Sequence, residues 1–185
     1  GLIDVHLHLM NGLGAFGVDP DIFGVGSGVT TVVDAGSAGH SLLTVFRNYV
    51  TRNAKTRVLN YVNLSTLGGV TGPGYSILAD PRLIDEDKIE KAVEANRDII
   101  VGIKIMATGG NMTPTLGPHE SQYTRTELTA AADEAHAHGL KLAAHAHGPQ
   151  GIADAMAAGA DSIEHCTFFT AEGVNADHNI LDQLA

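Results

Sequence analysis

The sequence has little of several features that would define other protein classes. Its 185 residues include a single cysteine, Cys166, so no disulfide framework can form within the chain, and we expect a reducing, cytoplasmic setting. Lys and Arg number 11 against 21 Asp and Glu, a formal charge of −10, which leaves no basic stripe for a nucleic-acid backbone. No uninterrupted apolar run approaches the roughly 20 residues of a membrane span. We therefore expect neither a nucleic-acid partner nor a membrane partner.

Glycine and histidine are abundant, with 22 and 10 copies. Short apolar runs alternate with helical patterns, which is typical of the βα units of a parallel sheet. Six strands are predicted, over residues 2–8, 29–34, 58–63, 99–105, 142–147 and 161–165. The length falls short of the about 250 residues of a complete eight-unit barrel. The sequence therefore predicts one α/β domain without a linker.

Helices are predicted between these strands, over residues 42–53, 85–96, 125–138 and 151–158. Thr124 followed by Glu127 suggests a capping box, and Gly139 and Gly159 follow two of the helices. Two segments interrupt the alternation of strands and helices and are predicted to be long loops, residues 65–82 and 107–124. Both follow the carboxyl ends of strands, where parallel α/β folds build their binding sites, so we expect them to shape a substrate pocket.

The first predicted strand carries an H-x-H pattern. A period of two places Asp4, His6 and His8 on one face of the strand. Two imidazoles about 7 Å apart along a strand end can reach one metal ion. By itself the pattern is weak, and ordinary polar residues at a strand end are an equal alternative.

The fourth predicted strand contains Lys104 among apolar residues. A buried ammonium group is unfavourable unless it is paired or chemically altered. Three interpretations stay open: a lysine that extends to water, a lysine with a depressed pKa, or one carbamylated by carbon dioxide. A carbamate is an anionic oxygen ligand that can bridge two cations.

The fifth predicted strand repeats the H-x-H pattern with His145 and His147, next to small alanines, and the sixth ends on His165. A single histidine at a strand end carries little information. The carboxyl ends of barrel strands converge on one mouth, however, so the combined set is much more specific than its parts.

The segments GLIDVHLHL, GVTTVVDAGSAG, VGIKIMATGG, AAHAHG and SIEHC occur in this order between Gly1 and about Phe168. Together they resemble the amidohydrolase superfamily of metal-dependent hydrolases. Residues 1–105 are similar to its deacetylase-like branch, which is related to dihydroorotases. Residues 104–168 are similar to the branch of Xaa-Pro dipeptidases, aryl-amide hydrolases and imidazolonepropionase-like enzymes.

The resemblance implies a (β/α)8 TIM-type barrel and a set of metal ligands. The first-strand histidines would bind the more buried of two metals, a carbamylated lysine would bridge both, and histidines of strands five and six would bind the second. On this chain the implied ligands are His6, His8, Lys104, His145 and His165. His147 is then expected to face the substrate or to lie behind the ligands.

The chain also departs from the family pattern. The family takes a catalytic, metal-binding Asp from the end of its eighth strand, whereas six strands are predicted here, so no catalytic residue is assigned. The small β domain that family members build from both termini is not predicted either. Residues 1–185 therefore correspond to an incomplete catalytic barrel, a partial (β/α)8 fold with about six of eight βα units, and look like a fragment of a longer enzyme.

Other candidates for the site are less specific. Asp34 and Glu164 are candidates to orient ligand histidines, with solvation or core capping as an equal alternative. His119 is expected to touch substrate from its loop, although an ordinary loop position is the commoner role. Cys166 is expected to pack behind the site.

The resulting hypothesis is a hydrolase that uses one or two divalent cations, zinc above all, to cleave a carbon–nitrogen bond, amide or peptide-like, with a metal-activated hydroxide. Its partner would be a small amide or dipeptide. The alternative is a non-catalytic, metal-binding part-barrel. Six units leave two unpaired sheet edges, so we also expect a homo-oligomer.

Overall fold

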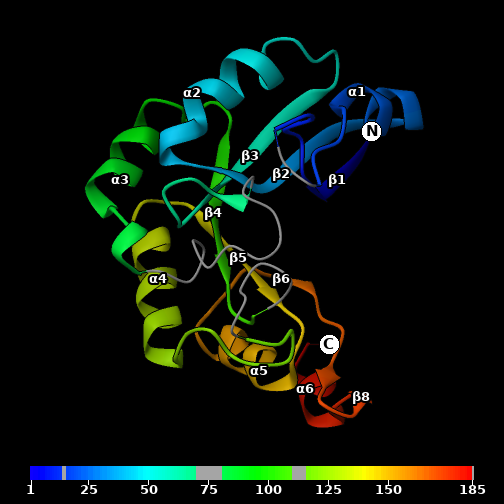
Figure 1. Cartoon of the computed structure of the whole chain (residues 1–185), viewed down its shortest axis with the longest axis vertical. Helices are drawn as coiled ribbons and strands as arrows, with labels where there is room; N and C mark the ends of the chain where they lie inside the picture. The colour runs from blue at the N-terminus through cyan, green and yellow to red at the C-terminus, as the bar shows by residue number, and fades with distance from the viewer. Residues whose placement is uncertain (14–15, 70–80, 110–115, 185) are drawn as a thin grey trace.

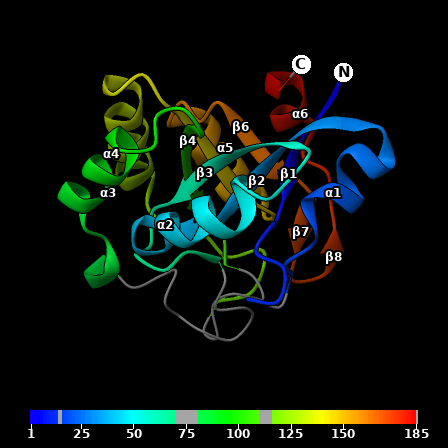
Figure 2. The same ribbon diagram turned by 90° about the horizontal axis from the view of Figure 1, so that it is seen from above.

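A computed structural model describes residues 1–13, 16–69, 81–109 and 116–184 of the chain. Six parallel strands pair in chain order: β1 (Leu2–Leu7), β2 (Val29–Gly39), β3 (Arg57–Asn63), β4 (Ile100–Met106), β5 (Lys141–Ala146) and β6 (Ser162–His165). The sheet curves so strongly that side chains of β1 and β6 touch (Figures 1 and 2). It forms a nearly closed barrel, which confirms the predicted partial TIM-type fold.

The main helices lie outside the curved sheet (Figure 2). They are α2 (Leu43–Phe46), α3 (Glu86–Glu94), α4 (Arg125–Ala137) and α5 (Pro149–Ala157). The single helix predicted over residues 42–53 is wrong in detail, because α2 continues as a π-helical turn, Arg47–Thr51. The sequence here, LTVFRNYVT, is rich in β-branched and aromatic residues, which favour a regular helix only weakly.

The sequence analysis missed several short elements. Helix α1 (Pro20–Phe23) follows Asp19, whose carboxylate caps it by accepting from the Asp21 and Ile22 amides at 2.8 and 3.2 Å. After β6 come a two-stranded hairpin, β7 (Phe169–Thr170) and β8 (Gly173–Val174), and helix α6 (His178–Leu184). Short 3-10 turns occupy Val25–Ser27, His40–Leu42 and Pro81–Leu83.

The predicted ends of the later helices are confirmed. The Thr124 hydroxyl accepts from the Glu127 amide at 3.3 Å, and the Glu127 carboxylate accepts from the Thr124 amide at 2.7 Å, which completes the capping box. Gly139 and Gly159 follow α4 and α5 with φ of +68° and +86°, a left-handed conformation that favours glycine.

Residues 70–80 and 110–115 of the two predicted loops lie outside the described residues. The described flanks of the second loop form a closed neck. Thr108 forms an antiparallel bridge with Ser121, and the Gly109 amide donates to the Glu120 carbonyl at 2.8 Å. The two ends of this loop are therefore fixed side by side, directly after β4 and just before α4.

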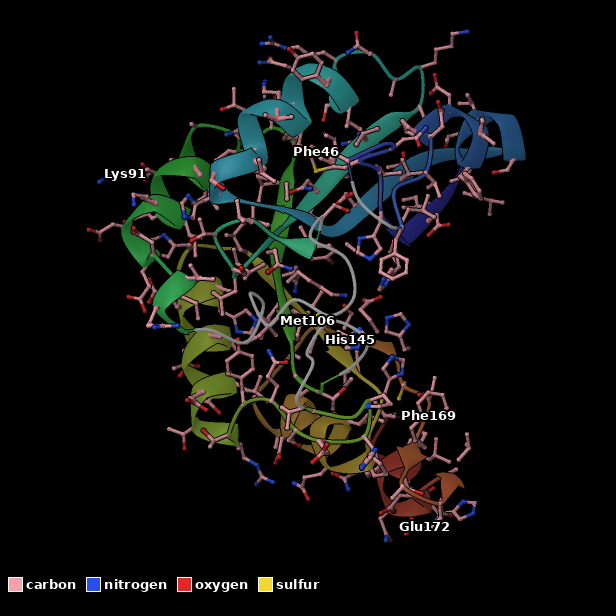
Figure 3. All side chains as sticks on the ribbon, viewed as in Figure 1. Phe46, Lys91, Met106, His145, Phe169 and Glu172 are labelled. Atoms are coloured by element: carbon pink, nitrogen blue, oxygen red, sulfur yellow. The ribbon has the colours of Figure 1, made fainter. Side chains whose placement is uncertain are left out.

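The core combines many buried apolar side chains with a few buried polar ones. Fully buried apolar residues fill the space between strands and helices: Val32, Leu43, Phe46, Val62, Leu128, Leu142 and Ile152. Phe46, the last residue of α2, is labelled in Figure 3. Asp34, Asn60 and Lys104 are also buried, although they are polar. No helix in the described part of the chain has the length and apolarity needed to cross a membrane.

Candidate metal centre

Five histidine rings meet at the carboxyl ends of β1, β5 and β6. His165 has ring centroids of His6, His145 and His147 at 4.8, 4.6 and 4.7 Å, and His6 lies 5.6 Å from His8. His145 and Phe169, labelled in Figure 3, lie on the same side of the molecule. Phe169 stacks on His147 at 5.3 Å and borders the cluster. The structure thus brings together the histidines that the sequence singled out on three separate strands.

One group of three rings has the spacing of a metal site. One nitrogen each from His145, His147 and His165 lies within 4.8 Å of the other two. Three imidazoles at such distances can reach a single cation. The sequence suggested that His147 lies beside the ligands, but its nitrogen belongs to the same group of three as those of His145 and His165.

The backbone after β6 brings His165 into the cluster. In the parallel pairing, Glu164 lies opposite His145 and His165 opposite the fully buried Ala146. Paired residues point to the same side of a sheet, so regular strand geometry would direct Glu164 toward the mouth and His165 away from it. Instead His165 and Cys166 have φ of +72° and +48°. This left-handed turn is unfavourable for non-glycine residues, and such strain is typical of functional sites.

Glu164 supports the first histidine. Its carboxylate contacts Nδ1 of His6 and accepts from the Ser162 hydroxyl at 2.9 Å. Burial alone would raise the pKa of Glu164, but the His6 hydrogen bond and the Lys104 charge lower it to about 2. Glu164 is therefore a carboxylate at neutral pH and contacts the His6 ring, so that its role as the residue that orients this histidine stays a prediction.

Asp34 reaches the second histidine only indirectly. It is fully buried, and its carboxylate accepts from the amides of Leu9 at 2.7 Å and Ser37 at 2.6 Å. Burial raises its pKa to about 6, against the effect of these hydrogen bonds. The contact with His8 is made by Ser37, whose Oγ lies 2.9 Å from His8 Nδ1. Ser37 went unnoticed in the sequence.

Lys104 lies under the histidines, with 2% of its surface exposed. Within the described residues its Nζ has no hydrogen-bond partner. Burial lowers its pKa to about 8, although Glu164 and Asp34 act in the opposite direction. Gly36, with φ of +86°, leaves room for it, because a Cβ there would lie 2.8 Å from the Cβ of Lys104. Of the three interpretations open from sequence, extension to water is excluded for this conformation.

Three of the histidines, His8, His145 and His165, are held in their neutral form. Burial, with help from neighbouring positive groups, lowers the pKa of His8 and His165 to about 4 and that of His145 to about 2. Nε2 of His145 is buried and, like Lys104 Nζ, has no partner among the described side chains. Neutral imidazoles with free nitrogens are the form that binds metal ions.

The remaining candidates lie around this cluster. His147 Nδ1 pairs with Thr167 Oγ1 at 2.7 Å, a second partner that the sequence did not reveal. His119 is half-buried, and its backbone packs on the turn after His147, since a Cβ on Gly148 would lie 2.1 Å from the His119 carbonyl oxygen. Cys166 is half-buried in the turn itself, and burial raises the pKa of its thiol.

Two curated relatives share about a third of their aligned residues with this chain. A deacetylase from Brucella anthropi is 38% identical over 108 residues, which is 58% of this chain and 27% of the deacetylase. An ochratoxinase from Aspergillus niger is 33% identical over 100 residues, 54% of this chain and 20% of the ochratoxinase. The chain therefore matches about a quarter or less of the length of these relatives.

Solved structures extend the similarity to the whole fold. A dihydroorotase superposes with a TM-score of 0.83 at 25% identity, covering 100% of this chain and 48% of the dihydroorotase. A Xaa-Pro dipeptidase superposes with a TM-score of 0.57 at 26% identity, covering 93% and 49% of the two chains. A sequence model of the Amidohydrolase family matches residues 1–180. With nearly its whole length matched, the chain belongs to the amidohydrolase family.

Proposed function

We propose that this chain is the catalytic part of a metal-dependent hydrolase that cleaves a carbon–nitrogen bond in a small amide or peptide-like substrate. The observation that carries the proposal is the meeting of five histidine rings near a buried lysine. Two buried nitrogens there, Lys104 Nζ and His145 Nε2, have no hydrogen-bond partner among the described residues. Family membership supports hydrolysis of this bond type, and the names of the relatives point the same way.

The residues present fit a site for one or two divalent cations, with zinc as the first choice. His8, His145 and His165 supply neutral imidazoles, the His6 ring lies beside His8 and His165, and His147 is close enough to contribute. Bound there, such cations would lower the pKa of water to about 7 and polarise a scissile carbonyl. The chain's own part is to hold these rings in place through Glu164 and Ser37.

Lys104 fits the role of a carbamate-bearing ligand. Because its pKa is only about 8, a sizeable fraction of the amine is neutral at physiological pH. A neutral amine adds carbon dioxide and releases one proton, which gives an anionic carbamate. The carbamate would offer oxygen ligands to two cations in place of the unpaired, buried amine. The free-energy cost of burying Lys104 without a partner would then no longer arise.

The test combines metal analysis with a substrate panel. We expect elemental analysis of protein from zinc-supplemented expression to find stoichiometric zinc, and a panel of N-acyl amino acids and Xaa-Pro dipeptides to include a substrate. The two substrate types follow the deacetylase and dipeptidase relatives. Protein without stoichiometric metal would contradict the proposal.

The edges of the sheet favour a second candidate, a metal-binding part-barrel without turnover. Among the described residues, β1 and β6 each pair with a single neighbouring strand, and Leu2, Ile3 and Val5 of β1 are 69%, 61% and 55% exposed. A family Asp from an eighth strand would add acid–base catalysis, typically worth about 10²–10⁴-fold. Bound zinc without hydrolysis of any panel member, together with self-association in gel filtration, would favour this candidate.

A further inference from the structure

Helices α3 and α4 leave an apolar cavity between them on the outer side of the barrel. It has a volume of about 410 Å³, and its lining includes Ile103 and Ile105 of β4. Because side chains alternate along a strand, these two lie on the opposite face of β4 from Lys104, so the cavity is separate from the histidine cluster. Figures 1 and 2 show both helices on the same side of the molecule.

The sequence of α4 explains why this space exists. Each helix lines the cavity with residues spaced i, i+3, i+4, i+7 and i+8, starting at Glu86 and at Glu127, which is one face of a helix. The apolar residues of α3 on this face are Ile89 and Val93, whereas those of α4 are all alanines: Ala130, Ala131 and Ala135. Helices pack by interlocking their side chains, and the short alanines fill little of the space toward α3, while α4 packs against α5.

The rim of the cavity is acidic. Five glutamates lie along it: Glu86, Glu90, Glu94, Glu127 and Glu134. The three on α3 are exposed and have no hydrogen-bond or ion-pair partner among the described residues. At one end Arg97 Nη1 donates to the His138 carbonyl at 2.7 Å, which joins the two helix ends and closes the cavity there. The result is an apolar floor between two acidic walls, with one closed end.

We propose that this cavity binds a small organic cation with an apolar body, such as an alkyl or aryl amine. Its volume lies within the range of about 300–1,000 Å³ that is typical of small-molecule sites. The apolar body covers Ile89, Ile103 and Ile105, and the ammonium group pairs with the glutamates of the rim. The closed end favours a compact ligand over a long partner helix, and the acidic walls disfavour an anion of the same shape. This inference does not depend on the proposed hydrolase function.

The first test compares three probes that share one apolar tail: n-octylamine, n-octanol and n-octanoate. Each is titrated into ¹⁵N-labelled protein at pH 7.5, and the backbone amide shifts of α3 and α4 report binding at the cavity. We expect octylamine to bind about tenfold more tightly than octanoate, because exposed charge pairs are individually weak but several glutamates act together here. Octanol, which carries no charge, should lie between the two.

A variant that fills the cavity tests the role of the apolar space. Ala131→Leu should weaken octylamine binding by about tenfold or more, because the larger side chain takes the place of the apolar tail. Ala137→Leu is the matched control, since it makes the same change at an exposed position of α4 that does not line the cavity. Urea unfolding checks that both variants are folded.

A second pair of variants tests the charge and changes no apolar residue. Glu90→Gln removes the central carboxylate of the α3 wall and should weaken octylamine binding by about two- to fivefold, with octanol binding unchanged. Asp87→Asn is its control, because Asp87 is an exposed acid of the same helix that does not line the cavity. It should leave the affinity for both probes unchanged.

Each outcome supports or overturns the inference. Shifts confined to the cavity, with the expected order of probes and variants, support it. No shifts at α3 and α4 with any probe, or equal octylamine affinity in Ala131→Leu and unmodified protein, would leave only a packing gap. Octanoate binding as tightly as octylamine would exclude the cation. Tighter binding of an amphipathic leucine–lysine peptide that displaces octylamine would assign the cavity to a partner helix, and shifts there that depend on protein concentration alone would assign it to a second copy.

Discussion

The two H-x-H motifs have the same spacing but different surroundings. In the first, both rings have a partner on Nδ1: Glu164 for His6 and Ser37 for His8. In the second, His147 is tied to Thr167, whereas Nε2 of His145 is buried with no partner among the described residues. Spacing decides which face of a strand the rings share, and the neighbouring strands decide which nitrogen stays free.

The largest effect should come from the residue that lies beneath both motifs. We expect Lys104→Ala to lose at least one metal and most of the hydrolytic activity, because the proposed carbamate on Lys104 would serve the two motifs at once. Small carboxylic acids should restore part of the activity by replacing the carbamate. Metal content and initial rates check this.

Lys141→Ala provides the control for that variant. Lys141 begins the neighbouring strand, is largely exposed and pairs with Asp161 at 2.6 Å, so its loss should leave metal and rate intact. Equal metal content and rate in the Lys104 and Lys141 variants would exclude a role for Lys104 in the site.

A smaller effect should distinguish the two rings of the second motif. We expect His145→Asn to lose one metal equivalent, because the buried Nε2 of His145 has no hydrogen-bond partner among the described residues. His147→Asn should keep more metal and act mainly on KM, since His147 is held by Thr167 at the edge of the cluster. Metal analysis and steady-state kinetics on the same substrate would show whether the order is reversed.

A still smaller effect is expected for Glu164→Gln, which tests whether the Glu164 carboxylate holds His6 of the first motif in place. An amide can still contact His6 but carries no charge, so we expect metal affinity to fall by about 10–100-fold. Glu134→Gln is the matched control, since Glu134 pairs with His138 at 3.0 Å on an exposed helix face. Chelator competition should find a change only for Glu164→Gln; two unchanged affinities would leave His6 independent of its carboxylate.

The smallest effect is on stability as a function of pH. Burial lowers the pKa of His8 from 6.5 to about 4 and that of His145 from 6.5 to about 2. Below pH 6.5 these rings therefore bind protons in the unfolded chain but stay neutral in the folded chain. The contribution of these rings to the free energy of unfolding is complete above pH 6.5 and falls with the pH. At pH 5 the loss is on the order of 1–2 kcal/mol for each residue.

Asp34 acts in the opposite direction, because its pKa is raised from 3.8 to about 6 and its burial becomes less unfavourable as the pH falls through 6. The pKa of His165 is also lowered, to about 4, so three histidines act against one carboxyl, and we expect metal-free protein to be less stable at pH 5 than at pH 7 in urea unfolding. Equal or greater stability at pH 5 would show that the rings are not held neutral.

Most of the barrel could be predicted from the sequence because each strand and helix has a local sequence pattern. The βα rhythm, the capping box at Thr124 and the histidines on three strands are local patterns, and the structure brings these histidines together as expected. The histidine partners depend instead on register between strands. Ser37 follows Asp34 by three residues, an arrangement typical of a side chain capping a turn, and that was the available signal.

The turn after β6 could not be predicted from the strand pattern. Alternation points Glu164 inward, and His165 joins the cluster only through left-handed backbone at two non-glycine residues. Such a conformation contradicts local preference and is maintained by the surrounding structure. The short elements after Phe168 were missed because their sequence has no clear period.

The neck of the loop after β4 matters for protein engineering. The Thr108–Ser121 bridge and the Gly109–Glu120 hydrogen bond fasten its two ends, and the Thr124 capping box starts α4 three residues after Ser121. The two ends of this segment, Gly109 and Glu120, are therefore joined to each other through their backbones. For a protein engineer, this neck marks two fixed points, one after β4 and one before α4, between which a new loop sequence can be joined without altering either element.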